Sequence, residues 1–66
     1  MKVTFNEKDD ALYVRLDQTP IVESEEVRPG VILDYDINEQ VVGVELLGLA
    51  GRIDRAALRS MHFEVA

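Results

Sequence analysis

Apolar and polar residues alternate along most of the first fifty positions, and a period of two is typical of β-strands with one covered face. The pattern predicts five strands, over residues 2–6, 11–17, 21–27, 31–37 and 41–49. The first two runs are separated by the polar segment 7–10 and are expected to form an N-terminal hairpin.

The breaks between the later runs carry recognisable turn chemistry. Pro29 and Gly30 fit the central pair of a type II turn, in which proline fixes φ and glycine supplies a positive φ. Residues 38–40 form a polar hairpin turn in this interpretation. The run 21–27 is crowded with glutamates, which suits the edge of a sheet because charge there discourages pairing with other chains.

After Gly51 the apolar spacing changes from two to the helical period, and alanine and leucine favour a helix over about 52–61. Residues 61–65 could add a short last strand. The sequence therefore predicts a single α+β domain, 1–66. Its sheet, over about 2–49, is small and antiparallel with four to five strands, and one C-terminal helix follows.

The chain has 66 residues, no cysteine and one histidine, so disulfides, cysteine-based zinc sites and thiol catalysis are excluded. A chain this short has a thin core, and oligomerisation is the remaining common source of stability. The run 41–49 is apolar on both sides, which indicates a second cover. We expect a homodimer or a partner protein, with Val41, Leu47 and Leu49 at the interface.

The formal net charge is −6, and eleven acidic residues against four basic ones lie in residues 1–51. Such a surface repels a phosphate backbone, so we expect no direct nucleic-acid binding, and a basic protein is the more natural partner. The opening residues lack a signal-peptide pattern, and no apolar run approaches a membrane span. A cytoplasmic location without membrane contact is expected.

One segment resembles a calcium-binding loop. Asp34, Asp36, Asn38 and Glu45 occupy positions 1, 3, 5 and 12 of an EF-hand-like spacing. Position 6, which needs glycine for a sharp turn, is Glu39, and the flanking residues predict strands instead of helices. The preferred interpretation is a hairpin turn without a metal, and calcium binding through these residues is the alternative.

Catalytic patterns are weak. Ser60 and His62 are two residues apart, a spacing that does not place helical side chains together, and no glycine-rich phosphate loop exists. Arg52, Arg55 and Arg59 form a stripe interpreted as a solvated helix face. Tyr13 and Tyr35 are expected to pack in or on the sheet. No enzyme activity and no cofactor are predicted.

Three stretches of the sequence resemble the family DUF2283: the opening strands, residues 23–27 with the block Pro-Gly-Val-Ile-Leu-Asp-Tyr-Asp at 29–36, and residues 42–47. The resemblance covers roughly residues 1–50. It implies a small, stand-alone, β-rich fold of unknown function without established catalytic residues. Members of the family are suspected partners of toxin-like proteins, so the resemblance implies an antitoxin-like role.

These observations lead to one functional hypothesis and one alternative. The hypothesis is a non-catalytic protein-binding or assembly module, a small homodimer with an antitoxin-like role as the acidic partner of a basic protein. The alternative is a small-ligand or calcium-binding protein.

Overall fold

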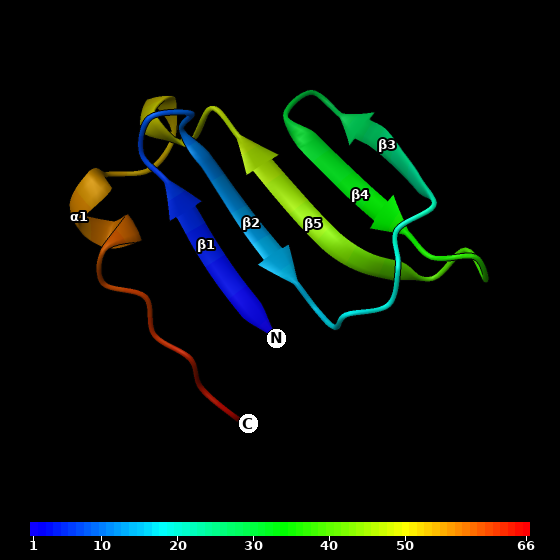
Figure 1. The fold of residues 1–66 in the computed structure, drawn as a ribbon. Coiled ribbons are helices and arrows are strands. Elements are labelled where there is room, and N and C mark those ends of the chain that lie inside the picture. The colour runs from blue at the N-terminus through cyan, green and yellow to red at the C-terminus, as the bar shows by residue number, and fades with distance from the viewer.

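The computed structural model describes residues 1–66 as a five-stranded antiparallel sheet followed by two short helical turns (Figure 1). The strands are β1 (Lys2–Asn6), β2 (Ala11–Arg15), β3 (Glu23–Arg28), β4 (Val31–Tyr35) and β5 (Val41–Leu47). A 3-10 turn, η1 (Leu49–Gly51), and a helix, α1 (Arg55–Leu58), follow the sheet. The predicted α+β class is confirmed.

The strand order is β1-β2-β5-β4-β3, so the last strand lies at the centre of the sheet. The hairpins β1–β2, β3–β4 and β4–β5 follow from the turns that the sequence predicts. The segment 16–22 connects β2 to β3 past β5 and β4. The glutamate-rich β3 forms one edge, as its charge indicates, and β1 forms the other.

Residues that lie opposite one another in the register share a face of the sheet. On one face the register aligns two rows of apolar side chains. We call this the apolar face; it carries Val3, Phe5, Leu12, Val14, Val31, Leu33, Val44 and Leu46. The opposite, polar face carries Thr4, Tyr13, Arg15, Ser24, Asp34 and Glu45.

A β-bulge interrupts this alternation in β5. Asp34 lies opposite Gly43, but the next residue of β4, Tyr35, lies opposite Val41, so Val42 is the extra residue. The amide of Leu16 donates to the carbonyl of Val42 at 2.8 Å, and this bond extends the β2–β5 ladder by one pair. The bulge therefore places Val41 on the same side of the sheet as Tyr35, which is the apolar side.

The C-terminal helix is shorter than predicted. It covers Arg55–Leu58 instead of residues 52–61, begins at the N-cap Asp54, whose carboxylate accepts from the amide of Ala56, and ends at Arg59. A helix of one turn has little intrinsic stability and depends on tertiary contacts. Residues 60–66 form no strand and are exposed.

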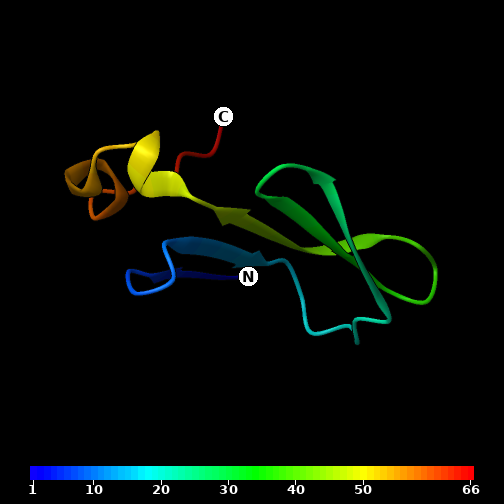
Figure 2. The ribbon, with the colours of Figure 1, turned by 90° about the horizontal axis from the view of Figure 1, so that it is seen from above.

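The core is small: six of the 66 residues are buried, and the apolar ones among them are Val42, Leu49 and Leu58. Figure 2 shows the sheet as a single layer, with η1, α1 and the tail on one side of it and the 16–22 connection on the other. The guanidinium of Arg15, on the polar face, donates to the carbonyls of Asp17 and Thr19. The connection therefore lies on the polar side, and η1 and α1 lie on the apolar side.

Neither helical turn has the length or apolar character that crossing a lipid bilayer demands.

The β3–β4 turn gives a stability prediction. Gly30 has a φ of +79°, and a Cβ added to it would lie 3.1 Å from the carbonyl oxygen of Leu47. Gly30→Ala is expected to lower the free energy of unfolding by about 1–2 kcal/mol, because L-residues are strained in this conformation. Gly51→Ala is the matched control: its Cβ would meet nothing within 4 Å, so a change within about 0.5 kcal/mol is expected. Equal losses in urea unfolding of both variants would contradict this account.

Candidate functional site

A hydrogen-bonded bridge crosses the polar face above the central strand. The hydroxyl of Tyr13, on β2, donates to Oδ2 of Asp34, on β4, at 2.7 Å. The hydroxyl of Ser24, on β3, donates to Oδ1 of the same carboxylate at 2.6 Å. Between Tyr13 and Asp34 lies Gly43 of β5, where a Cβ would come within 2.5 Å of the tyrosine oxygen. Glycine at this position therefore makes the bridge possible.

The bridge has a simple electrostatic basis. Burial raises the pKa of Tyr13 above its ordinary value of 10.0, and the hydrogen bond to the anionic Asp34 raises it further, while Arg15 opposes the rise. The neutral phenol is thus the form that the fold favours. Asp34 is buried, and each of its two carboxylate oxygens accepts a hydrogen bond, so neither oxygen is left without a partner inside the sheet.

The four residues of the calcium-like spacing lie in a hairpin turn and on two strands of the sheet. Oδ1 of Asp36 accepts from the amides of Asn38 at 2.8 Å and Gln40 at 2.9 Å, which closes the β4–β5 turn. Asp34 serves the bridge, and Glu45 lies on β5 opposite Tyr13. No group of three or more histidine, cysteine or acidic side chains has an arrangement that could hold a metal ion.

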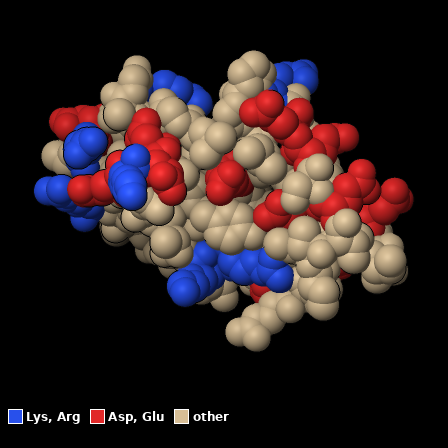
Figure 3. All heavy atoms as spheres, turned by 45° about the horizontal axis from the view of Figure 1, so that its top comes forward, with Lys and Arg blue, Asp and Glu red and all other residues tan.

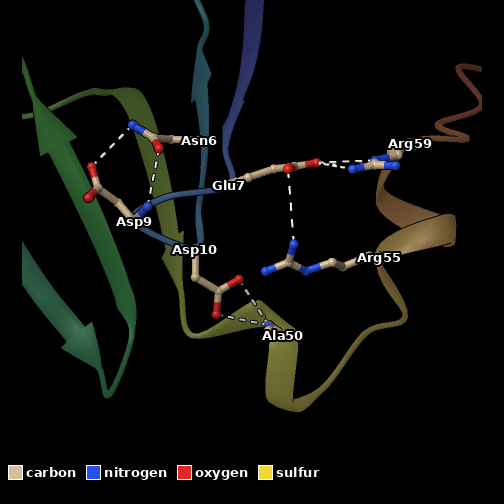
Figure 4. A network of polar contacts seen from close by, with 7 residues as sticks. All are labelled: Asn6, Glu7, Asp9, Asp10, Ala50, Arg55 and Arg59. Carbon is tan, nitrogen blue, oxygen red and sulfur yellow. Dashed lines mark hydrogen bonds and ion pairs between the residues drawn. The ribbon is translucent and has the colours of Figure 1, made fainter.

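The arginine stripe is partly an anchor for the C-terminal segment (Figure 4). Nη2 of Arg59 lies 2.7 Å from Oε1 of Glu7, and Nη1 of Arg55 lies 4.0 Å from the other oxygen. The hydrogen bond and charge of Arg59 lower the pKa of Glu7. The carboxylate of Asp10 accepts from the amide of Ala50 at 2.9 and 3.0 Å. Both contacts fasten the C-terminal segment to the first hairpin turn.

The remaining candidate groups do not converge. His62 lies beyond the end of α1, is exposed, and is 3.7 Å from Glu64. Tyr35 lies on the apolar side, two strands from Tyr13, so the two tyrosines do not pair. The Tyr35 hydroxyl donates to Glu25 at 3.4 Å.

Acidic side chains gather over the β3–β4 half of the molecule (Figure 3). Part of this cluster surrounds Tyr35 at an open hollow of about 260 Å³, which is lined by Glu23, Glu25, Tyr35 and Glu39.

The three residues predicted for an interface have different environments. Leu49 is 1% exposed within its own chain, so it is not available to a partner. Leu47 is half-buried and lies opposite Ala11, on the side of the polar face. Val41 is 36% exposed and lies on the apolar side because of the bulge. The sequence pattern contained no signal for the bulge or for the burial of Leu49 by the chain itself.

A different apolar surface is open instead. None of the eight side chains of the apolar face is buried, and Val3 is 43% exposed. Leu16 continues the row of Leu12 and Val14 and is 39% exposed. The sequence identified these residues as one side of each strand, but only the strand order shows that they form a continuous surface.

The bridge above Gly43 can be tested through the only two tyrosines of the chain. In a Tyr35→Phe background, absorbance titration reports Tyr13 alone, and its midpoint is expected above pH 10. The favourable effect of Tyr13 on folding is complete below pH 10 and is lost as the pH rises through the folded-state pKa. Adding Gly43→Ala is expected to displace the phenol, lower the midpoint towards 10 and cost about 1–3 kcal/mol of stability. An unchanged midpoint would contradict the bridge.

Comparison with known proteins identifies one matching family model and no individual protein that matches. No curated protein and no solved structure matches the chain significantly. The family model of DUF2283, described as a protein of unknown function, matches residues 2–49, from the start of β1 to the first residue of η1. This match spans the whole sheet and most of the 66 residues, and the chain therefore belongs to the DUF2283 family.

Proposed function

We propose that this protein is a non-catalytic assembly module that forms a homodimer by packing the apolar face of its sheet against the same face of a second copy. The observation that carries the proposal is the apolar face, two adjacent rows of apolar side chains that the chain itself leaves half-buried or exposed. Antiparallel sheets that pack face to face lie about 10 Å apart and bury such rows in a shared core.

The position of the helical turns supports this proposal. Leu49 and Leu58, which come from η1 and α1, are buried. η1 lies beside the β1–β2 turn and α1 lies alongside the outer edge of β1 near the same end of the sheet (Figure 1). The rest of the apolar side has no covering element (Figure 2). The sheet of a second copy has a matching shape and can cover the rest of the apolar face.

The size of the surface also supports it. Four strands spaced by about 4.8 Å and about 17 Å long present roughly 300 Å² in projection. A patch of this size is within the range of the largest apolar patch on a typical monomer, and such patches are often functional. A two-fold axis brings the same patch of both copies together, so an apolar patch is complementary to itself without further specialisation.

Charge distinguishes the two faces. On β1, β2, β4 and β5 the apolar face carries no charged residue, whereas the polar face carries Lys2, Arg15, Asp34 and Glu45. Burying the polar face in a dimer would desolvate these charges at a high cost. The apolar side carries acidic residues on the edge strand β3, where Glu23 lies opposite Tyr35 and Glu25 lies opposite Leu33. A contact confined to the other four strands has no such cost.

The proposal predicts a specific sensitivity of the oligomeric state. Leu16 and Val41 are 39% and 36% exposed in the single chain, so lysine can replace each without entering a core. Leu16→Lys and Val41→Lys are expected to weaken the dimer at least tenfold, because each places a charge in an apolar contact. Sedimentation velocity over a range of protein concentrations measures the effect.

The matched control is Thr4→Lys, which adds the same charge at an exposed position on the polar face. This variant is expected to dimerise like the parent chain or slightly better, because it reduces the repulsion between two chains of charge −6. A parent chain that sediments as a single copy at 100 µM would refute the proposal.

An acidic edge favours a second candidate function, binding of a basic protein in an antitoxin-like manner. Glu23, Glu25 and Glu26 lie on the edge strand β3, and Glu39 lies at the nearby turn. Exposed acidic groups in this number attract a basic surface and accelerate its association.

This second function has its own test. Under this second function, the basic toxin-like partner is expected to bind the chain with an affinity that falls at least tenfold between 50 and 300 mM salt. Replacing Glu23 and Glu25 by glutamine is expected to remove most of that salt dependence. Replacing Glu45 and Glu64 by glutamine, on β5 and on the C-terminal tail, is the control and is expected to leave it intact. An affinity that changes neither with salt nor with the β3 substitutions would exclude the acidic edge as the contact.

A further inference from the structure

The two edges of the sheet differ in how they are protected. The edge strand β3 carries three glutamates and a register shift between Glu26 and Arg28, both of which discourage a further strand from pairing. The other edge strand, β1, has Lys2 as its single charged residue and no bulge or proline. It is the edge that is open to strand addition.

The backbone groups available at the β1 edge follow from the hydrogen-bond pattern. The amide of Leu16 donates to β5, and backbone groups alternate in direction along a strand, so Tyr13 and Arg15 direct theirs towards β1. Their partners, Thr4 and Lys2, are bonded to β2. Val3 and Phe5 consequently direct their N–H and C=O groups away from the sheet.

The C-terminal tail, residues 60–66, has the pattern of a strand and no partner. Met61, Phe63 and Val65 alternate with His62 and Glu64, and the three apolar side chains are 59%, 82% and 81% exposed. The tail runs from α1 back towards the end of the sheet where β1 begins (Figure 1). It stands off the sheet on the apolar side (Figure 2).

The ion pair at the start of the tail sets a register. Arg59 contacts Glu7, the residue that follows β1, at 2.7 Å (Figure 4). Antiparallel pairing continued from these two positions places Met61 opposite Phe5 and Phe63 opposite Val3, with all four side chains on the apolar face. It also places Glu64 opposite Lys2 on the polar face. Apolar and oppositely charged cross-strand pairs both stabilise a sheet.

We propose that the free edge of β1 is a strand-binding site that takes the tail of the same chain as a sixth, antiparallel strand. Val3 and Phe5 supply the backbone hydrogen bonds, and the apolar side chains of the tail widen the apolar face. The Arg59–Glu7 contact already holds the start of the tail at the end of β1, so the closure is intramolecular and has the high effective concentration of a short tether. This strand addition does not depend on the proposed dimer.

A designed disulfide tests the register, because the chain contains no cysteine. In the proposed pairing Thr4 and His62 form a non-hydrogen-bonded pair, whose Cα atoms lie about 4.5 Å apart, a distance that a disulfide spans. The full-length variant Thr4→Cys/His62→Cys is oxidised with glutathione at low micromolar concentration, and the products are measured by mass spectrometry and non-reducing gel. An intrachain disulfide in most molecules is expected.

The matched control is Thr4→Cys/Phe63→Cys, in which the second cysteine is one residue away and faces the other side. It is expected to form at least fivefold less intrachain disulfide. Equal yields from both pairs, no intrachain product, or a product that is mainly interchain would overturn the proposal.

A second measurement avoids cysteine variants. Hydrogen exchange at the amides of Val3 and Phe5 is expected to be at least tenfold faster in a chain that ends at Arg59 than in the full chain. Unchanged exchange in the shortened chain would overturn the proposal. Sedimentation of the same shortened chain reports the dimer separately, so the failure of one proposal is distinguishable from the failure of the other.

Discussion

A five-stranded sheet has two faces, and this chain has enough residues outside the sheet to cover only part of one of them. The hydrophobic free energy of a small domain depends on removing apolar area from water, and three buried apolar residues contribute little of it. The apolar face is therefore both the main source of stability available to the sheet and a surface that one chain leaves incomplete. The open apolar face, the exposed tail and the short helix all follow from this shortage of covering residues.

The polar face meets the same constraint in a different way. Only the 16–22 connection lies on this side, and the polar side chains form hydrogen bonds with one another across the strands. The bridge from Tyr13 to Asp34 and on to Ser24 spans four strands with two hydrogen bonds, and Arg15 fastens the 16–22 connection beside it. Such a network specifies strand order, since Tyr13 reaches Asp34 only when β5 separates their strands and presents glycine between them. The polar face is thus stable when exposed to water, whereas the apolar face is not.

The parts of the fold that depend on local chemistry could be predicted from the sequence. Period-two alternation, the Pro29–Gly30 turn and the glutamates of β3 predicted the strands, a turn and an edge, and the structure confirms them. The central position of β5 could not be predicted, because it depends on pairing between distant residues. The bulge at Val42 and the contact of Arg59 with Glu7 are non-local for the same reason. The helix was predicted too long because its periodicity continues past Leu58, where no packing surface supports it.

The calcium-like spacing shows how a local pattern can have two structural uses. Acidic and amide residues at alternating positions suit a metal loop, and they also suit a hairpin turn in which a carboxylate accepts backbone amides. Asp36 adopts the second use, and Glu39, the residue that argued against a metal loop, takes a left-handed conformation with a φ of +63° inside that turn. The sequence favoured the turn and kept the metal loop as the alternative, and the structure shows the turn contacts of Asp36.

Because β5 is central, the sheet cannot be completed until the last strand has been synthesised. During synthesis the hairpins β1–β2 and β3–β4 leave the ribosome before the strand that joins them. The inner edges, on β2 and β4, are therefore unpaired until β5 arrives, and the apolar side of each hairpin is exposed to water. During this interval an unpaired edge of one nascent chain is open to pairing with an unpaired edge of a neighbouring chain. The glutamates at residues 23, 25 and 26 protect the outer edge of one of these hairpins, on β3, during that interval. The N-terminal hairpin has no comparable protection. It is the part of the nascent chain most prone to pair with another chain until residue 47 has emerged from the ribosome.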